Sequence, residues 1–119
     1  MRGWQVVFSG PHEVSWEPFD LPTPRAGEVR VRALCSLIST GTEMTAFSQG
    51  FAEGTHWAHY VRYPHLPGYS LIGQVERLGA GVETLVAGQR VAVSATHATH
   101  HVVPASACSA VPDELSNEE

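Results

Sequence analysis

Cysteine is scarce in this sequence of 119 residues, which contains only Cys35 and Cys108. Two cysteines cannot form the dense disulfide framework that stabilises many small secreted domains. Both lie in apolar stretches, where a cysteine usually serves as a small hydrophobic residue. We therefore expect free thiols and a cytoplasmic location.

Long apolar runs and positive charge are also lacking. No window has the roughly 18 consecutive apolar residues that a membrane-spanning helix needs, and the opening MRGWQVVF lacks the apolar core and cleavage site of a signal peptide. The formal net charge of −5 argues against a nucleic-acid-binding surface. The remaining composition, 43% hydrophobic and 16% charged residues, is typical of one globular domain. We expect neither a nucleic-acid nor a membrane partner.

Short apolar segments separated by glycine and proline predict a mainly β fold. Several of them alternate between polar and apolar residues, which is the period of a strand buried on one face. In the second segment this pattern places Val14, Trp16 and Pro18 on the buried face. Many short strands joined by tight turns favour a partly open β-barrel with short helices. The predicted strands cover residues 4–9, 13–19, 28–37, 71–78, 90–93, 100–103 and 107–111.

One short helix is predicted after the third strand. Thr42 has a side chain suited to an N-cap, and Met44, Phe47 and Phe51 then fall on one helical face. Gly50 is expected to end or bend this helix.

Residues 66–93 carry the most specific pattern, two β-branched runs around a glycine-rich middle. Their motifs PGYSLIGQV, LGAGV and VAGQRVAV resemble, in order, the core signature of the medium-chain dehydrogenase/reductase family, the relatives of zinc-type alcohol dehydrogenases. GEVRVR at 27–32, STGTE at 39–43 and HVVP at 101–104 resemble further motifs of that family. The likeness covers nearly the whole chain.

This resemblance implies that residues 1–115 form the family's N-terminal catalytic domain, a GroES-like barrel. In that family a second, Rossmann domain holds NAD(P). Residues 116–119 spell an S-x-x-E capping box, the mark of a helix start, and we interpret them as the beginning of the connection to that domain. We expect the chain to be a piece of a longer NAD(P)-dependent oxidoreductase that is inactive by itself.

No cofactor-binding residue is expected within the chain. Gly79-Ala80-Gly81 lacks the third glycine and the following helix of a dinucleotide-binding fingerprint. Under the resemblance, the nucleotide is held by the Rossmann domain, which lies outside this sequence.

The resemblance also bears on zinc. Zinc-dependent members of the family bind the catalytic ion with a cysteine and a histidine. The corresponding positions here hold Ser39, or Thr40 with a different gap placement, and Tyr69. A neutral hydroxyl is a poor substitute for a thiolate, and a phenol with a pKa of about 10 is not a zinc ligand at neutral pH. The chain also has too few cysteines for the family's four-cysteine zinc lobe. We expect no zinc and a place in a zinc-independent branch.

Without zinc, hydroxyl donors must stabilise the oxygen of a carbonyl or alcohol substrate. Thr42 occupies the position of the family's proton-relay hydroxyl, and Tyr69 and Ser39 replace metal ligands, so the candidate catalytic set is Ser39, Thr42, Glu43 and Tyr69. Each has a plainer interpretation. Thr42 is a helix N-cap, Glu43 a first-turn charge on the helix dipole, and Tyr69 a packed tyrosine with a satisfied hydroxyl.

Residues 51–65 are rich in aromatic and histidine side chains with no clean period, which predicts a loop with at most one helical turn. Phe47, Trp57 and Tyr60 are candidates for lining a substrate pocket. The alternative is ordinary core beneath a long loop.

Seven histidines raise a metal hypothesis. His56 and His59 share a face if their segment is helical. His97, His100 and His101 cluster near the strand after residue 93, but His100 and His101 point to opposite faces of that strand. Three converging ligands are needed, so we predict no dedicated metal site, although a metal-dependent enzyme using these histidines stays an alternative. A second alternative is a free-standing GroES-like module that binds or assembles without catalysis. Homo-oligomerisation is compatible with either.

Overall fold

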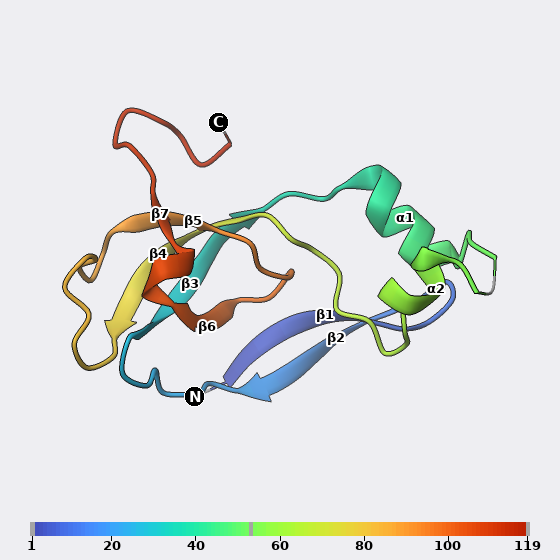
Figure 1. Ribbon diagram of the computed structural model, residues 1–119, viewed down its shortest axis with the longest axis horizontal. Helices are drawn as coiled ribbons and strands as arrows, with labels where there is room; N and C mark the ends of the chain where they lie inside the picture. The colour runs from blue at the N-terminus through green and yellow to red at the C-terminus, as the bar shows by residue number, and fades with distance from the viewer. Residues whose placement is uncertain (1, 53, 119) are drawn as a thin grey trace.

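Antiparallel pairing organises the chain into two sheets (Figure 1). The computed structural model describes residues 2–52 and 54–118. A two-stranded sheet pairs β1 (Arg2–Gly10) with β2 (Glu13–Asp20), and a five-stranded sheet has the order β6-β3-β4-β5-β7. The strands of the larger sheet are β3 (Glu28–Ser36), β4 (Leu71–Leu78), β5 (Arg90–Val93), β6 (His100–Pro104) and β7 (Ser109–Ala110).

Backbone hydrogen bonds join the two sheets outside the regular strands. The Val6 N–H donates to the His97 carbonyl at 2.9 Å, and the Thr99 N–H donates to the Trp4 carbonyl at 2.8 Å. Phe8 and His65 exchange two further bonds, each of 2.8 Å. The sheets are linked without closing, so the predicted partly open, mainly β barrel is confirmed.

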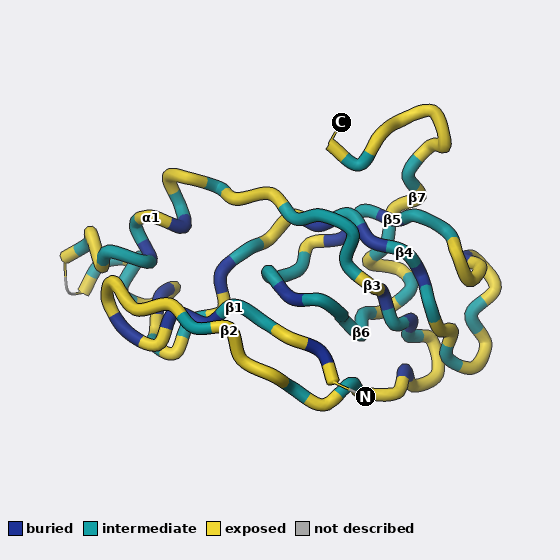
Figure 2. The backbone as a smooth tube through the Cα atoms, turned by 180° about the vertical axis from the view of Figure 1, so that it is seen from behind, coloured by how far each residue is buried: buried dark blue, intermediate teal, exposed yellow. Residues whose placement is uncertain are grey.

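Two hydrophobic clusters hold the fold together. The first lies between the strands of the larger sheet, where the buried positions of β3 and β4 alternate as the pattern predicts (Figure 2). Its fully buried members include Val29, Val31, Val75 and Val91. Cys108 packs against this cluster from the far end of the chain, in keeping with its expected role as a small hydrophobic residue.

The second cluster attaches the helices to β1. Phe8, Ala46 and Val61 form its centre, and partly buried aromatic rings surround them. The helices are α1 (Thr40–Ser48) and α2 (His56–Tyr60), which lie together at one end of the molecule (Figure 1), with a 3₁₀ turn η1 (Ala105–Ala107) elsewhere. No helix in the described part of the chain is both long and apolar enough to cross a membrane.

The predicted helix forms, but its ends and part of its buried face differ from expectation. The N-cap is Ser39, which leaves Thr42 inside the first turn. The left-handed residue that ends the helix is Gln49, with φ 56°, and not Gly50. Met44 is 55% exposed. Phe47 and Phe51 pack against the second cluster as predicted. The buried helix positions are Ala46, which belongs to that cluster, and Glu43, which faces His97.

Strand β2 has the predicted position but the wrong burial. Val14 and Trp16 are 59% and 53% exposed, and Pro18 is also exposed. The register sets Val14 opposite Phe8, so both side chains share one face of the sheet. The second cluster buries Phe8 only, and Trp16 merely stacks on Trp4 with ring centroids 6.1 Å apart.

The end of the chain also departs from expectation. Strand β7 covers only Ser109–Ala110, because η1 takes up part of the predicted segment 107–111. Residues 113–118 form turns and irregular backbone, and the connection expected at residues 116–119 stays a prediction. The last member of the predicted capping box, Glu119, lies outside the described residues.

Candidate functional site

Three polar side chains from separate parts of the chain form one hydrogen-bonded series. Ser36 Oγ lies 2.6 Å from His97 Nδ1, and His97 Nε2 lies 2.6 Å from Glu43 Oε1. The side chains of His97 and Glu43 are only 11% and 9% exposed. A charge-assisted hydrogen bond is stronger between buried side chains than in water, because little solvent competes for its donor and acceptor.

Glu43 is positioned by the first turn of α1. Its second carboxylate oxygen, Oε2, accepts from the Ser39 backbone N–H at 2.8 Å, and the Glu43 N–H donates in return to the Ser39 carbonyl at 2.8 Å. A carboxylate near a helix N-terminus is favoured because unpaired N–H groups point toward it. The expected first-turn charge is therefore present, and it is buried and aimed at His97.

His97 lies in the loop between β5 and β6, and its backbone is bonded on both sides. Its N–H donates to the Pro67 carbonyl at 2.9 Å, and its carbonyl accepts from Val6. Gly68 packs directly against it, with φ +105°, and a Cβ placed there would lie 2.7 Å from the His97 nitrogen. The imidazole is thus held between the segment before β4 and strand β1.

The hydrogen-bond partners define where protons sit. An ionised Glu43 only accepts, so His97 Nε2 carries the hydrogen that faces it. Nδ1 of the neutral ring is then an acceptor and takes the Ser36 hydroxyl hydrogen. This assignment follows from the partner atoms, and it makes Nδ1 a base directed at Ser36 Oγ.

Ser36 and His97 both line an open cavity of about 440 Å³ between the end of β3 and the two-stranded sheet. Among the described residues that line it, the ionisable side chains are His97 and Cys35. The lining residues are Val6, Trp16, Ala33, Leu34, Cys35, Ser36, Ile38, His97, Ala98 and Thr99.

The other predicted catalytic residues are not gathered at this point. Ser39 contributes its backbone N–H to Glu43. Thr42 is half-buried in the first turn of α1. Tyr69 is 42% exposed and lines a separate cavity of about 250 Å³ beside Ser94 and Ser109. The alternative of a packed tyrosine does not hold for this exposed side chain, and a catalytic role for Tyr69 stays a prediction.

The three predicted pocket aromatics lie around the second hydrophobic cluster. Phe47 contacts Phe8 edge to face, with centroids 5.4 Å apart, and Trp57 packs against the same cluster. Tyr60 is 49% exposed and meets the Trp57 ring at 5.8 Å. Their role in substrate binding stays a prediction.

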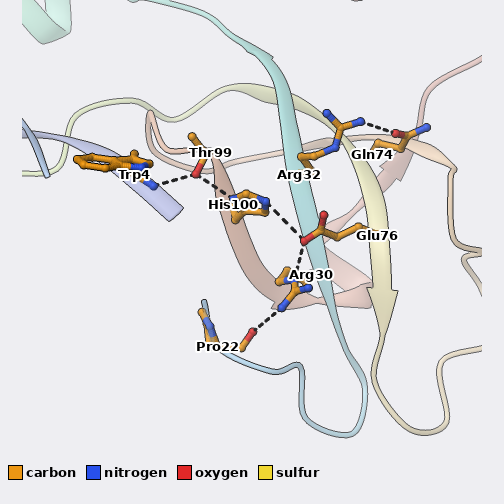
Figure 3. Close-up of polar contacts among 8 residues, drawn as sticks. All are labelled: Trp4, Pro22, Arg30, Arg32, Gln74, Glu76, Thr99 and His100. Atoms are coloured by element: carbon orange, nitrogen blue, oxygen red, sulfur yellow. Dashed lines mark hydrogen bonds and ion pairs between the residues drawn. The ribbon is translucent and has the colours of Figure 1, made fainter. Parts of the chain in front are cut away.

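The histidines near residue 100 separate into three environments. His97 faces Glu43, whereas His100 lies 2.9 Å from Thr99 Oγ1 and 3.6 Å from Glu76 Oε2, which also binds Arg30 (Figure 3). His101 Nε2 lies 2.8 Å from the Thr96 carbonyl. Across residues 2–52 and 54–118, no three His, Cys, Asp or Glu side chains group as metal ligands would.

Two histidines have perturbed acidity. Burial lowers the pKa of His65 below its ordinary value of 6.5, while the Glu43 charge opposes that shift. Burial is also the main cause that lowers the pKa of His101 from 6.5, opposed by its bond to the Thr96 carbonyl and assisted by His100. Both side chains are therefore held in the neutral form over a wider pH range than in an unfolded chain.

Sequence reasoning named Glu43 as a catalytic candidate and His97 only as a possible metal ligand, and it missed Ser36. Ser36 precedes His97 by 61 residues, and Glu43 precedes it by 54. No local spacing connects residues so far apart. The loop that carries His97 is hydrogen-bonded to β1 through Val6. This neighbourhood can be recognised only once the strand order is known.

The glycines at 79 and 81 serve the turn after β4. A Cβ at Gly79 would lie 1.9 Å from the Arg25 carbonyl oxygen, so this glycine allows two backbones to pass closely. The chain continues from there to β5 without a helix. This turn does not fit the phosphates of a dinucleotide, which need a helix N-terminus directly after the glycines.

Comparison with known proteins gives consistent relatives. The family model described as alcohol dehydrogenase GroES-like domain matches residues 25–117. The starvation-sensing protein RspB of Escherichia coli K12 is 28% identical over 102 residues, which are 85% of this chain and 27% of RspB. The chain therefore spans about a quarter of the length of that relative.

Solved structures show the same fold. The crystal structure of a short chain alcohol dehydrogenase (rspB) from E. coli CFT073, complexed with NADH, superposes with a TM-score of 0.76 at 21% identity and covers 98% of this chain and 40% of that one. Escherichia coli quinone oxidoreductase complexed with NADPH gives a TM-score of 0.69 at 18% identity, covering 97% and 35%.

Proposed function

Because the chain belongs to the alcohol dehydrogenase GroES-like domain family, we propose that it is the substrate-side domain of an NAD(P)-dependent oxidoreductase. In this proposal residues 1–115 form the domain, and residues 116–119 lead into a Rossmann domain that holds the coenzyme. The solved relatives that cover this chain are more than twice as long, and two of them carry NADH or NADPH. The proposed substrate is a small carbonyl compound or alcohol.

The coenzyme, when bound by the second domain, supplies or accepts a hydride. The chain's own part is to bind the substrate, position its oxygen and handle the proton. We propose that this occurs without zinc, since Ser39 and Tyr69 offer hydroxyls where the family's zinc-dependent members have ligands. Ser39, Thr42, Glu43 and Tyr69 are the residues that the family motifs propose for this task, and Glu43 has the most support because its carboxylate is buried against His97.

One observation carries this proposal beyond family membership. A buried carboxylate, an imidazole and a hydroxyl are linked in series and end at an apolar cavity of about 440 Å³. Such a series moves protons between a buried site and a bound molecule, which is the task that a hydride-transfer enzyme leaves to its protein side chains. Phe47, Trp57 and Tyr60 are proposed to extend the substrate surface.

The test uses the natural protein as its complete reading frame encodes it. We expect NADH or NADPH to be oxidised when small aldehydes or ketones are added, as followed by nicotinamide absorbance. The chain of residues 1–119 alone should bind neither nucleotide tightly in fluorescence titration. Tight binding by this chain alone would contradict the proposed division of labour.

A natural stop codon directly after residue 119, with no hydride transfer, would favour the free-standing binding module instead. A cytoplasmic location and a homo-oligomeric state belong to the same proposal. Fractionation of cells and size-exclusion chromatography of the natural protein test these two parts.

A further inference from the structure

We propose that Ser36 and His97 form the proton relay of this site and serve the oxygen of an uncharged, largely apolar carbonyl or alcohol substrate. This inference rests on the proposed function and deepens it. It moves the reacting hydroxyl from Thr42 and Tyr69 to Ser36, which combines a place on the cavity wall with a 2.6 Å contact to an imidazole nitrogen.

The other polar groups on the cavity wall are committed elsewhere. Thr99 Oγ1 accepts from the Trp4 N–H at 2.9 Å and contacts His100. The Cys35 thiol donates to the Asn117 carbonyl at 3.4 Å. Ser36 alone among these lining groups is bonded to the His97–Glu43 pair, so a substrate oxygen that reaches Ser36 gains a path for its proton.

The proton step is balanced within the chain's own residues. In alcohol oxidation the substrate O–H breaks and its proton goes to Ser36 Oγ. The original Ser36 hydroxyl proton goes to His97 Nδ1, which becomes an imidazolium. The electron pair left on the substrate oxygen forms the carbonyl as the hydride leaves to the nicotinamide coenzyme. In carbonyl reduction the same protons move in reverse.

Glu43 makes this transfer favourable as a positioning residue. Its carboxylate fixes the hydrogen on His97 Nε2 and faces the positive charge that develops on the ring, at 2.6 Å. The titratable group bonded to His97 is Glu43 from α1. His65, from the segment before β4, interacts electrostatically with Glu43, and Cys35 lines the same cavity as His97. Oxidation thus needs neutral His97, and reduction needs the imidazolium.

The cavity wall defines the substrate class. Val6, Trp16 and Ile38 offer apolar surface around the polar end. Among the described residues, no lysine, arginine, aspartate or glutamate lines the cavity, so none of these side chains would pair with a charged substrate there. A carboxylate there would lose hydration without gaining a charged partner, which selects against acids and for neutral aldehydes, ketones and alcohols.

Kinetics of the natural protein test the relay. Ser36→Ala should lower kcat for benzaldehyde reduction by about 100-fold or more, as expected when a proton-transfer group is lost, with KM changed less than about threefold. His97→Asn should lower kcat by a similar factor, because Ser36 Oγ then has no imidazole base for its proton. Ser106→Ala and His59→Asn, at exposed positions away from the cavity, are the matched controls.

A measurement without turnover tests the same relay in the chain of residues 1–119. Nitrogen NMR should show neutral His97 with its hydrogen on Nε2, and Ser36→Ala should shift Nδ1 alone. Glu43→Gln should alter the Nε2 signal. A hydrogen on Nδ1 in the neutral wild-type ring would overturn the relay.

Substrate choice gives the last reading. We expect benzaldehyde to exceed para-carboxybenzaldehyde in kcat/KM by at least about 10-fold, the cost of one poorly solvated charge. An active wild type with an equally active Ser36→Ala variant overturns the relay and leaves the proposed function standing. A preference for the charged aldehyde overturns the substrate class. A wild type that transfers no hydride overturns the proposed function and the relay with it.

Discussion

At Gly68 the backbone passes directly against the His97 residue. Its φ of +105° lies in a region that L side chains rarely adopt, and a Cβ there would meet the His97 backbone nitrogen at 2.7 Å and two ring carbons at 2.9 Å. Two separate obstacles therefore act on any substitution at this position. The glycine fixes where the imidazole can lie.

Gly68→Ala should destabilise the fold by about 2–4 kcal/mol, the sum of backbone strain and a clash that only a shift of His97 relieves. Gly81→Ala is the control, since its φ is +79° but no atom lies within 4 Å of the added carbon. We expect a cost of about 1 kcal/mol there. Urea unfolding of the two variants measures the difference. Equal losses of unfolding free energy would show that His97 moves aside without cost.

Single residues also mark the limits of what the sequence predicts at the site. Glu43 and Ser39 are recognisable because they fall in a short contiguous motif and meet within one helical turn. Ser36 sits at the end of a predicted strand and His97 in a loop, and neither carries a local sign of its partner. Tyr69 was selected by its place in a motif, but the motif carries no information on which way its side chain points.

At the scale of elements, the strands were predictable and the helix cap was not. Strands β3 to β6 lie within a residue or two of the predicted ranges, because alternation with glycine and proline boundaries is a strong local signal. Thr42, Ser39 and Thr40 are all adequate N-caps by type. The observed N-cap is Ser39, whose side chain makes no capping bond. Its backbone N–H donates to Glu43, and Glu43 in turn pairs with His97, a contact that no local pattern reveals.

The exposure of one face of β2 is likewise set by tertiary packing and not by the local sequence. Alternation shows that Val14 and Trp16 share a face, but the cover of that face depends on where α1 and α2 come to rest. The helices cover only the end of the sheet that carries Phe8. Apolar side chains at the other end border the cavity, as Trp16 does.

A pair of substitutions across one rung of this sheet measures that asymmetry. Phe8→Ala should cost about 3–5 kcal/mol of unfolding free energy, because it leaves a cavity beneath both helices. Val14→Ala, directly opposite but 59% exposed, should cost less than about 1 kcal/mol. Denaturant midpoints at constant slope give both values. A costly Val14→Ala would mean that something covers this face in solution.

At the scale of the whole molecule, the neutral histidines couple folding to pH. The pKa values of His65 and His101 are lowered in the fold by burial, relative to 6.5. Below that value the unfolded chain binds protons that the folded chain does not, so protons favour unfolding. The stability that these groups contribute is present above pH 6.5 and is lost as the pH falls through their lowered values.

We therefore expect the urea midpoint to fall between about pH 7.5 and about pH 5.5, with His101→Gln reducing the fall because it keeps a donor for the Thr96 carbonyl and cannot titrate. His59→Gln, on the exposed side of α2, should leave the fall unchanged. If the urea midpoint of His101→Gln falls with pH as much as that of the wild type, groups other than His101 cause the pH dependence.

In the hydrogen-bonded series, His97 lies 61 residues after Ser36 and 54 residues after Glu43 along the chain. Contacts of such range close late, since the entropy of looping out the intervening residues must be overcome first. The valine core depends on contacts of the same range, because β3 pairs with β6 through Val31 and His101. In a refolding experiment on the natural protein, activity should accordingly return together with the β-sheet signal and not before it.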